Sequence, residues 1–210
     1  MGDIRRVRSR RFYEFHLIGS GELVARANTD WVYLDRATAR PVSVPDDMMM
    51  AFAPDQPDAA PRERFPAAPP PPPGIYSMNR ITEWRDIDSA GHVNNATYFN
   101  YMEECGIRAA RDVGWEMDRM RNEGMAIVAR RHRIEYRQQA SLGEELTIST
   151  YLSDVRRMSA IRHYIIARAT DGAVLAQAQT LWVFLNLNTG GLLRVNPDFI
   201  TDFAATIAEG

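Results

Sequence analysis

The sequence predicts an α+β fold, in which an antiparallel sheet wraps around one long helix. Two observations support this prediction. From residue 75 onward, a strand-like run is followed by a helical pattern and then by four more strand-like runs. Part of the same pattern also occurs near the N-terminus, where a proline-rich segment separates it from the rest of the chain.

One long helix is expected over residues 95–113, after the strand-like run at residues 75–84. Its apolar residues recur at helical spacing on one face: Tyr98, Met102, Cys105 and Ala109. Gly114 follows the last of them, as is typical of a helix end.

Four strands are expected after the helix, because the runs there are rich in β-branched and aromatic residues. These runs are residues 125–136, 145–152, 159–169 and 173–187. Asp171-Gly172 indicates a hairpin turn between the last two. Asn196-Pro197 predicts a short terminal helix over residues 198–207, because proline is favoured in the first turn of a helix.

The chain divides into three segments. Residues 53–74 contain P-A-A-P-P-P-P-P-G, which favours extended polyproline geometry and predicts a linker. Residues 75–210 then form a complete α+β domain, and residues 1–52 form a partial unit related to its second half.

The two sides of the linker are related at a constant offset of 151 residues, which aligns residues 23–38 with residues 174–189. Seven identities follow this offset: Ala25, Ala27, Thr29, Trp31, Val32, Leu34 and Thr38 match Ala176, Ala178, Thr180, Trp182, Val183, Leu185 and Thr189. A constant offset indicates an internal duplication.

The N-terminal part lacks the first strand and the helix, and so few residues could hardly bury a core alone. We therefore expect residues 10–50 to add strands to the open sheet edge of the second unit. The alternative is that the chain lacks its true N-terminus.

Composition narrows the function. The net charge is −2, which gives no reason to expect nucleic acid or a membrane as partner. All 25 basic residues are arginine, so lysine nucleophiles are excluded. Cys105 is the only cysteine, which excludes an intrachain disulfide and a multi-thiolate zinc site. We expect no metal and no cofactor.

Localisation follows from what the sequence does not contain. No apolar run approaches the roughly 20 residues of a membrane span. The basic N-terminus is not followed by the apolar core of a signal peptide. A cytoplasmic protein is therefore expected.

The chemistry is concentrated in residues 86–101, D-I-D-S-A-G-H-V-N-N-A-T-Y-F-N-Y. Two acids, a histidine and two asparagines occur within ten residues, just before the predicted helix. A turn that brings an acid and an imidazole to the start of a buried helix is suited to polarising a carbonyl.

The string W-R-D-I-D-S-A-G-H-V-N-N-A-T-Y-F-N-Y-M-E-E resembles the signature of hotdog-fold acyl thioesterases, both acyl-CoA and acyl-ACP enzymes. The resemblance covers residues 75–208 in element order. It implies a hotdog fold, here an incomplete double hotdog, and hydrolysis of an acyl thioester to free fatty acid and thiol. It also implies an acyl-CoA or acyl-carrier-protein substrate and a homo-oligomer formed by hotdog pairing.

The resemblance assigns roles to particular residues. Asp88 matches the acid that attacks the thioester or activates water, and His92 matches the imidazole of the acyl-ACP branch. Asn95 lies where a backbone N–H binds the thioester oxygen. Asn94 and Tyr98 are candidate substrate-binding residues.

Two departures from the acyl-ACP pattern favour the simpler acyl-CoA type, in which one aspartate carries most of the chemistry. Ala90 stands where the acyl-ACP enzymes have asparagine, and Gln139 stands where they have glutamate.

Structural roles compete with the functional ones for several residues. Asp88 could cap the helix, Asp86 could be a solvated or turn-fixing acid, and Asn94 and Asn95 could be turn formers. Glu103 and Glu104 fit solvated or interface-facing carboxylates, and Cys105 fits a buried small hydrophobe. Two other functions stay open, a non-catalytic acyl-thioester-binding scaffold and a hotdog hydratase or dehydratase.

Overall fold

The computed structural model describes residues 4–38, 40–52 and 64–209. The chain divides into two compact units, residues 1–64 and 65–210. Residues 53–63, half of the expected linker, lie outside the described residues, so the extent of the linker stays a prediction.

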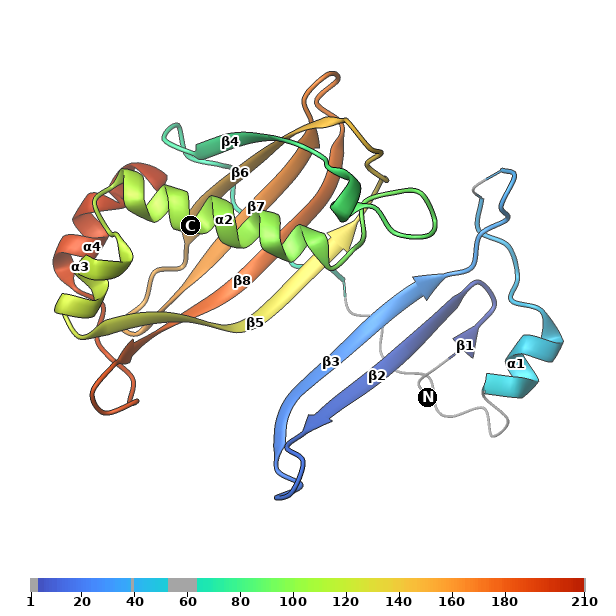
Figure 1. Cartoon of the computed structure of the whole chain (residues 1–210), viewed down its shortest axis with the longest axis horizontal. Coiled ribbons are helices and arrows are strands. Elements are labelled where there is room, and N and C mark those ends of the chain that lie inside the picture. The colour runs from blue at the N-terminus through green and yellow to red at the C-terminus, as the bar shows by residue number, and fades with distance from the viewer. Residues whose placement is uncertain (1–3, 39, 53–63, 210) are drawn as a thin grey trace. The chain divides into compact units, whose positions relative to one another are not determined.

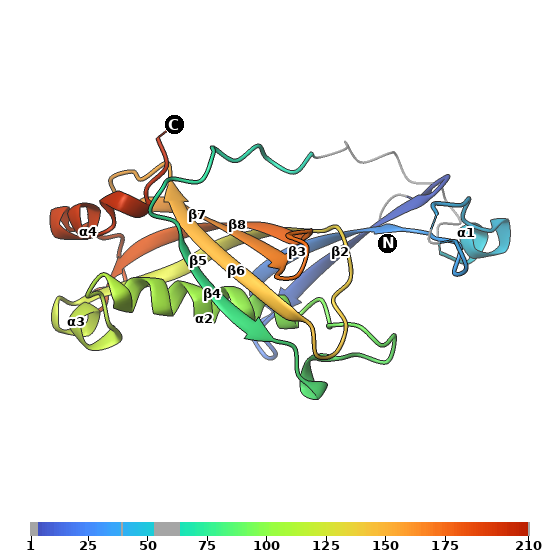
Figure 2. The same ribbon diagram turned by 90° about the horizontal axis from the view of Figure 1, so that it is seen from above.

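The C-terminal unit is a five-stranded sheet with one long helix along one of its faces (Figures 1 and 2). The strand order is β4-β6-β7-β8-β5, and all neighbours are antiparallel. The strands are β4 (Tyr76–Ile81), β5 (Met125–Tyr136), β6 (Glu145–Ser153), β7 (Ser159–Arg168) and β8 (Val174–Asn186). The predicted α+β fold is confirmed, and the last four strands match their predicted bounds to within one residue.

The long helix, α2 (Thr97–Asp112), buries the face that its periodicity predicts. Its buried residues are Tyr98, Tyr101, Met102, Cys105, Gly106, Ala109 and Ala110. Gly114 follows with φ of 80°, a left-handed conformation that favours glycine and ends the helix.

Helix α2 lies close to the sheet at Gly106. A Cβ atom there would lie 3.0 Å from the Tyr164 hydroxyl and 3.2 Å from Arg162 Nη1. The Arg162 guanidinium is buried, donates to the Gly106 carbonyl at 3.1 Å and lies over the Trp182 ring. A larger residue at position 106 would therefore require these neighbours to shift by a few tenths of an ångström.

Short helices complete the core at the far end of α2. Helix α3 (Met117–Asn122) precedes β5, and α4 (Pro197–Asp202) follows β8. Asn196 caps α4 by accepting from the Asp198 N–H at 2.9 Å, with Pro197 in the first turn as predicted. Two short 3₁₀ helices, Trp84–Asp86 and Ala204–Thr206, flank these elements.

The described part of the proline-rich segment packs onto the C-terminal sheet. The Tyr151 hydroxyl donates to the Pro69 carbonyl at 2.8 Å, and the Gln179 side chain donates to the Pro66 carbonyl at 3.1 Å. Because side chains alternate along β7, His163 points to the opposite face from Arg162, and it stacks on the Tyr151 ring. This segment therefore covers the face that α2 leaves open.

The N-terminal unit is a three-stranded antiparallel sheet followed by a short helix. Its elements are β1 (Ile4–Arg5), β2 (Arg8–His16), β3 (Leu23–Val32) and α1 (Asp46–Phe52). The strands pair in the order β1-β2-β3. The expected addition of residues 10–50 to the sheet of the other unit stays a prediction.

The β2–β3 hairpin repeats the register of the β7–β8 hairpin at the offset of 151. Ser9 pairs with Trp31 as Ala160 pairs with Trp182, and this correspondence runs along the whole ladder. Both ladders shift register at the same place: Phe15/His16 in one and Ile166/Ala167 in the other. A shared bulge is strong support for the duplication, because periodicity alone does not require it.

The repeat continues beyond the hairpin. The isolated bridge Leu34–Pro41 corresponds to Leu185–Leu192. The Val44 N–H donates to the Arg6 carbonyl as the Val195 N–H donates to the Arg157 carbonyl. Helix α1 then begins where α4 begins in the other copy, so the N-terminal unit reproduces β7, β8 and α4.

Candidate active site

The predicted site lies in a tight loop between the 3₁₀ helix Trp84–Asp86 and α2. An isolated antiparallel bridge between Ile87 and Val93 closes the loop. Inside it, the Asp88 N–H donates to the His92 carbonyl at 2.9 Å, and Gly91 adopts a left-handed φ of 84°. These constraints hold Asp88 and His92 on the same short turn.

The structure brings Asp88 and His92 together. The Asp88 carboxylate accepts from the Ala90 N–H at 2.8 Å, and its other oxygen lies 3.6 Å from His92 Nδ1. The side chains are 26% and 24% exposed, so both reach solvent while being held by the loop. Asp88 does not cap α2, because its side chain bonds inside its own loop.

The two asparagines build the start of α2. The Asn94 side chain accepts from the Ala96 N–H at 2.9 Å, and its carbonyl accepts from the Thr97 N–H. The Asn95 carbonyl accepts from the Tyr136 hydroxyl at 2.7 Å. The Asn95 N–H has no acceptor among the described residues, and Asn95 is exposed.

Asp86 is a turn-fixing acid, one of its two expected roles. It is 5% exposed and accepts from the Glu83 N–H at 2.8 Å, while its own carbonyl accepts from the Asn94 N–H. It thus ties the 3₁₀ helix to the start of α2. Asp86 also lies near the Tyr101 hydroxyl, whose pKa is raised, first by burial and then by Asp86.

Tyr98 and Cys105 lie in the core of the C-terminal unit. Tyr98 is 2% exposed and packs edge-on against Tyr136, and burial raises its pKa to about 12. Contact with substrate would therefore need an opening in the core, and the substrate-binding role of Tyr98 stays a prediction. Burial also raises the pKa of the Cys105 thiol to about 12, which keeps the thiol protonated near neutral pH.

The two glutamates of α2 differ in their surroundings. Glu104 pairs with Arg80 at 2.8 Å and with Arg108 on the next turn. Glu103 is exposed. Neither residue lies in the Asp88 loop.

Tyr136 is the site residue that sequence reasoning missed. It is the last residue of β5 and belongs to the string E-Y-R-Q-Q of residues 135–139. It lies 41 residues from Asn95, and its hydroxyl holds the backbone at the helix start. The string itself was the only signal available.

Among residues 4–38, 40–52 and 64–209, no group of three His, Cys, Asp or Glu side chains could hold a metal ion. The helices of these described ranges are all too short or too polar to cross a membrane.

An antiparallel sheet around one long helix is the architecture of the hotdog fold, and the acid–histidine loop leads into that helix. The model of the Thioesterase-like superfamily matches residues 82–205. The chain belongs to this superfamily and is an acyl thioester hydrolase.

Individual relatives agree with this assignment. The chain is 31% identical over 106 residues to the long-chain acyl-CoA thioesterase FadM of Escherichia coli. This match covers 49% of this chain and 77% of FadM. It is 32% identical over 129 residues to oleoyl-acyl carrier protein thioesterase 1 of Arabidopsis thaliana. That match covers 59% of this chain and only 36% of the Arabidopsis protein.

A solved structure shows the same fold. The 1,4-dihydroxy-2-naphthoyl-CoA thioesterase of Synechocystis is 18% identical and superposes with a TM-score of 0.58. The superposition covers 62% of this chain and 96% of the Synechocystis protein. The hotdog fold is therefore confirmed.

Proposed function

We propose that this chain hydrolyses acyl-CoA thioesters to a free fatty acid and CoA, with Asp88 as the catalytic carboxylate. The main support is the position of this carboxylate: it reaches solvent in a rigid loop that leads directly to the start of α2. One carboxylate beside a helix start is enough for thioester hydrolysis, because the thiolate leaves readily and only an attacking oxygen and an oxyanion site are needed.

The backbone N–H of Asn95 is the proposed oxyanion donor. It is exposed and without an acceptor among the described residues, whereas its neighbours' donors are used by Asp86 and Asn94. The positive end of the α2 dipole adds to the stabilisation of negative charge there. Tyr136 holds the Asn95 carbonyl and so fixes the orientation of the peptide that follows Asn95.

Asp88 can act in two ways. As a general base it takes a proton from water, and the resulting hydroxide oxygen bonds to the thioester carbon. As a nucleophile its own oxygen bonds to that carbon and forms a mixed anhydride, which water then hydrolyses. In both cases the C–S bond breaks, the sulfur leaves with the electron pair, and the thiolate is protonated from solvent.

His92 is proposed to orient the Asp88 carboxylate or the attacking water. Its Nδ1 lies 3.6 Å from the carboxylate, and 3.4 Å from the Val93 carbonyl. Asn94 supports the site through its bonds to Ala96 and Thr97.

The CoA preference rests on the two departures from the acyl-ACP pattern. Ala90 has no polar side chain to place beside the acid, and its backbone N–H bonds to Asp88 instead. Gln139 carries no charge, and its backbone carbonyl accepts from Arg168. FadM, an acyl-CoA enzyme, is also matched over more of its length than the Arabidopsis acyl-ACP enzyme.

A thiol-release assay across acyl-CoA chain lengths tests the proposal. We expect Asp88→Asn to lower kcat by about 10²–10⁴-fold, with unchanged folding by circular dichroism. Asp118→Asn is the matched control, because that side chain is 84% exposed on α3. Full turnover by Asp88→Asn would refute the role of Asp88.

The two roles of Asp88 are separated by single turnover in ¹⁸O-labelled water. If Asp88 is a nucleophile and water attacks the aspartyl carbon of the anhydride, the label enters Asp88 and the first product is unlabelled, whereas a general base delivers the label directly to the product and never to Asp88. Tight binding of acyl-CoA without thiol release would instead support a non-catalytic scaffold, and turnover of enoyl-CoA would support a hydratase.

A further inference from the structure

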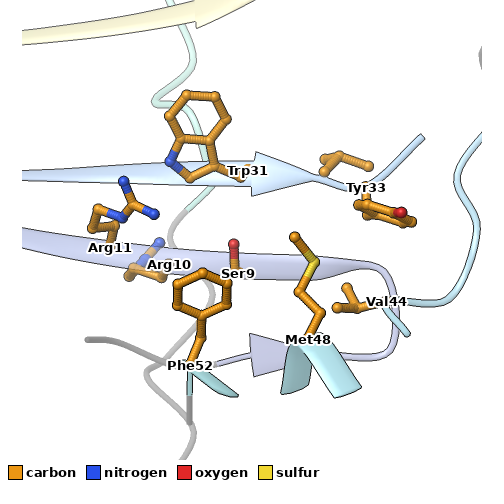
Figure 3. Close-up of a pocket in the computed structure, with 9 residues that line it drawn as sticks. Ser9, Arg10, Arg11, Trp31, Tyr33, Val44, Met48 and Phe52 are labelled. Atoms are coloured by element: carbon orange, nitrogen blue, oxygen red, sulfur yellow. The ribbon is translucent and has the colours of Figure 1, made fainter. Parts of the chain in front are cut away.

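The N-terminal unit contains an apolar hollow between the β2–β3 hairpin and α1 (Figure 3). Its main lining residues are Ser9, Arg11, Trp31, Tyr33, Met48 and Phe52, and we call it the N-terminal hollow. All of its lining residues belong to this unit, so it is defined without reference to the other unit.

The internal repeat identifies what fills the same space in the C-terminal unit. The residues 151 positions later include Ala160, Phe184, Phe199 and Phe203, and these form one core cluster. The same cluster contains Ala110 near the end of α2, Trp115 just after it, and Met125. The described N-terminal unit has no counterpart of these three residues. The N-terminal hollow therefore corresponds to the place where the end of α2 packs in the C-terminal unit.

The side chains that line the N-terminal hollow are much more exposed than their counterparts in the C-terminal unit. Tyr33 is 38% exposed, whereas its counterpart Phe184 is 0% exposed. Met48 and Phe52 are 40% and 42% exposed, whereas Phe199 and Phe203 are both 0% exposed. Large apolar residues left this accessible together indicate an interaction surface.

The charge of the hollow matches a helix backbone. Tyr164 and Arg162 are the two side chains nearest to Gly106 of α2, and their counterparts are Tyr13 and Arg11. Arg162 donates to the Gly106 carbonyl, whereas the Arg11 guanidinium has no hydrogen-bond or ion-pair partner among the described residues. A cation in the lining of an apolar hollow favours an occupant that brings a carbonyl oxygen and no positive charge.

We propose that the N-terminal hollow binds a helix supplied by a partner segment built like residues 97–116 of this chain. The helix presents a face of glycine and alanine to β2, offers a backbone carbonyl to Arg11, and is followed by an aromatic side chain that packs between Tyr33 and Met48. The partner is thus the helix-bearing half of another hotdog unit.

A labelled peptide with the sequence of residues 97–116 tests this on the full chain. A covalent staple between positions 103 and 107, which both face solvent in α2, keeps the peptide helical without altering the binding face. We expect saturable binding by fluorescence anisotropy. The same peptide with Ala110→Glu should bind at least tenfold more weakly, because its small-residue face no longer fits.

Matched variants locate the binding. Met48→Asp should weaken peptide binding at least tenfold, and Met50→Asp on the same helix should not, because Met50 is 72% exposed and does not line the hollow. Arg11→Glu should also weaken binding, with Arg26→Glu as the control on the neighbouring strand. The second pair tests the same site even if Met48→Asp unfolds α1.

Three results would overturn the proposal. The first is the absence of saturable binding by the stapled peptide, and the second is equal binding by both members of each variant pair. The third is a different occupant: self-association or fatty-acid binding that Met48→Asp abolishes while the stapled peptide fails to compete.

Discussion

Two aspartates two residues apart have different environments, and only one of them fits the chemistry. Asp86 is buried and its carboxylate is used by the Glu83 N–H, whereas Asp88 reaches solvent beside His92. The sequence located this pair because turn residues and a helix start are local signals. It could not assign the burial of Asp86 or the Tyr136–Asn95 bond, because both depend on segments brought together by folding.

Tyr136 offers a residue-scale test of how the helix start is held. Tyr136→Phe should lower kcat about tenfold with little change in KM, since the Asn95 peptide loses its anchor and the oxyanion donor is less well oriented. The stability cost of one such hydrogen bond is about 1 kcal/mol. Steady-state kinetics and urea unfolding measure the two effects.

Tyr151→Phe is the matched control for this prediction. It removes an equivalent hydroxyl bond, to the Pro69 carbonyl on the opposite face of the sheet. It should cost similar stability and leave kcat unchanged. A similar loss of kcat in both variants would mean that Tyr136 acts only through stability.

His163 makes the stability of the C-terminal unit depend on pH. Burial lowers its pKa to about 4 from an ordinary value of 6.5, and its Nε2 lies 2.6 Å from the Ser153 hydroxyl. Between these two values the unfolded chain binds a proton that the folded chain does not. The free energy of unfolding should therefore be highest above pH 6.5. It should fall by about 3 kcal/mol as the pH drops toward 4.

Urea unfolding across this pH range measures the effect. His163→Gln keeps a polar partner for Ser153 and should flatten the dependence between pH 6.5 and 5. His16→Gln, at an exposed histidine of the N-terminal unit, should leave the pH dependence of the C-terminal unit as it is. An unchanged slope in His163→Gln would contradict the assignment.

At the scale of elements, long periodic segments were predictable and short helices were not. Strands β5 to β8 and helix α2 carry enough residues for their period to be read from the sequence. Helices α1 and α3 span seven and six residues, fewer than two full turns, and were missed. Neither helix has a buried residue, so neither carries the long apolar periodicity that reveals α2 in the sequence.

The contact between α2 and β7 depends on a missing side chain. Gly106→Ala would place a Cβ against Tyr164 and Arg162, which are themselves buried and have little room to move. We expect a net loss of about 1–2 kcal/mol, because overpacking outweighs the higher helix propensity of alanine. Chemical denaturation measures the loss, and Ile107→Ala on the exposed side of the helix is the control. A more stable Gly106→Ala protein would show that the sheet can yield.

At the scale of the whole molecule, one prediction concerns how the N-terminal unit is protected. We predict that residues 10–50 add strands to the sheet of the second unit, so limited proteolysis of the full chain should spare them. Rapid loss of residues 1–52 with residues 75–210 intact would count against this prediction. Pairing of hotdog units into a homo-oligomer is likewise predicted, and light scattering coupled to gel filtration measures it.

The shared bulge of the two hairpins has a consequence for engineering. Because neither copy has gained or lost a residue from Arg8 to Phe52 relative to its counterpart, the two stretches are equal in length, and their hairpins share one pairing register. A chimaera that carries residues 8–52 in place of 159–203 therefore needs no new junction design. Its folding would report which side chains have diverged to suit their own surroundings since the copies separated.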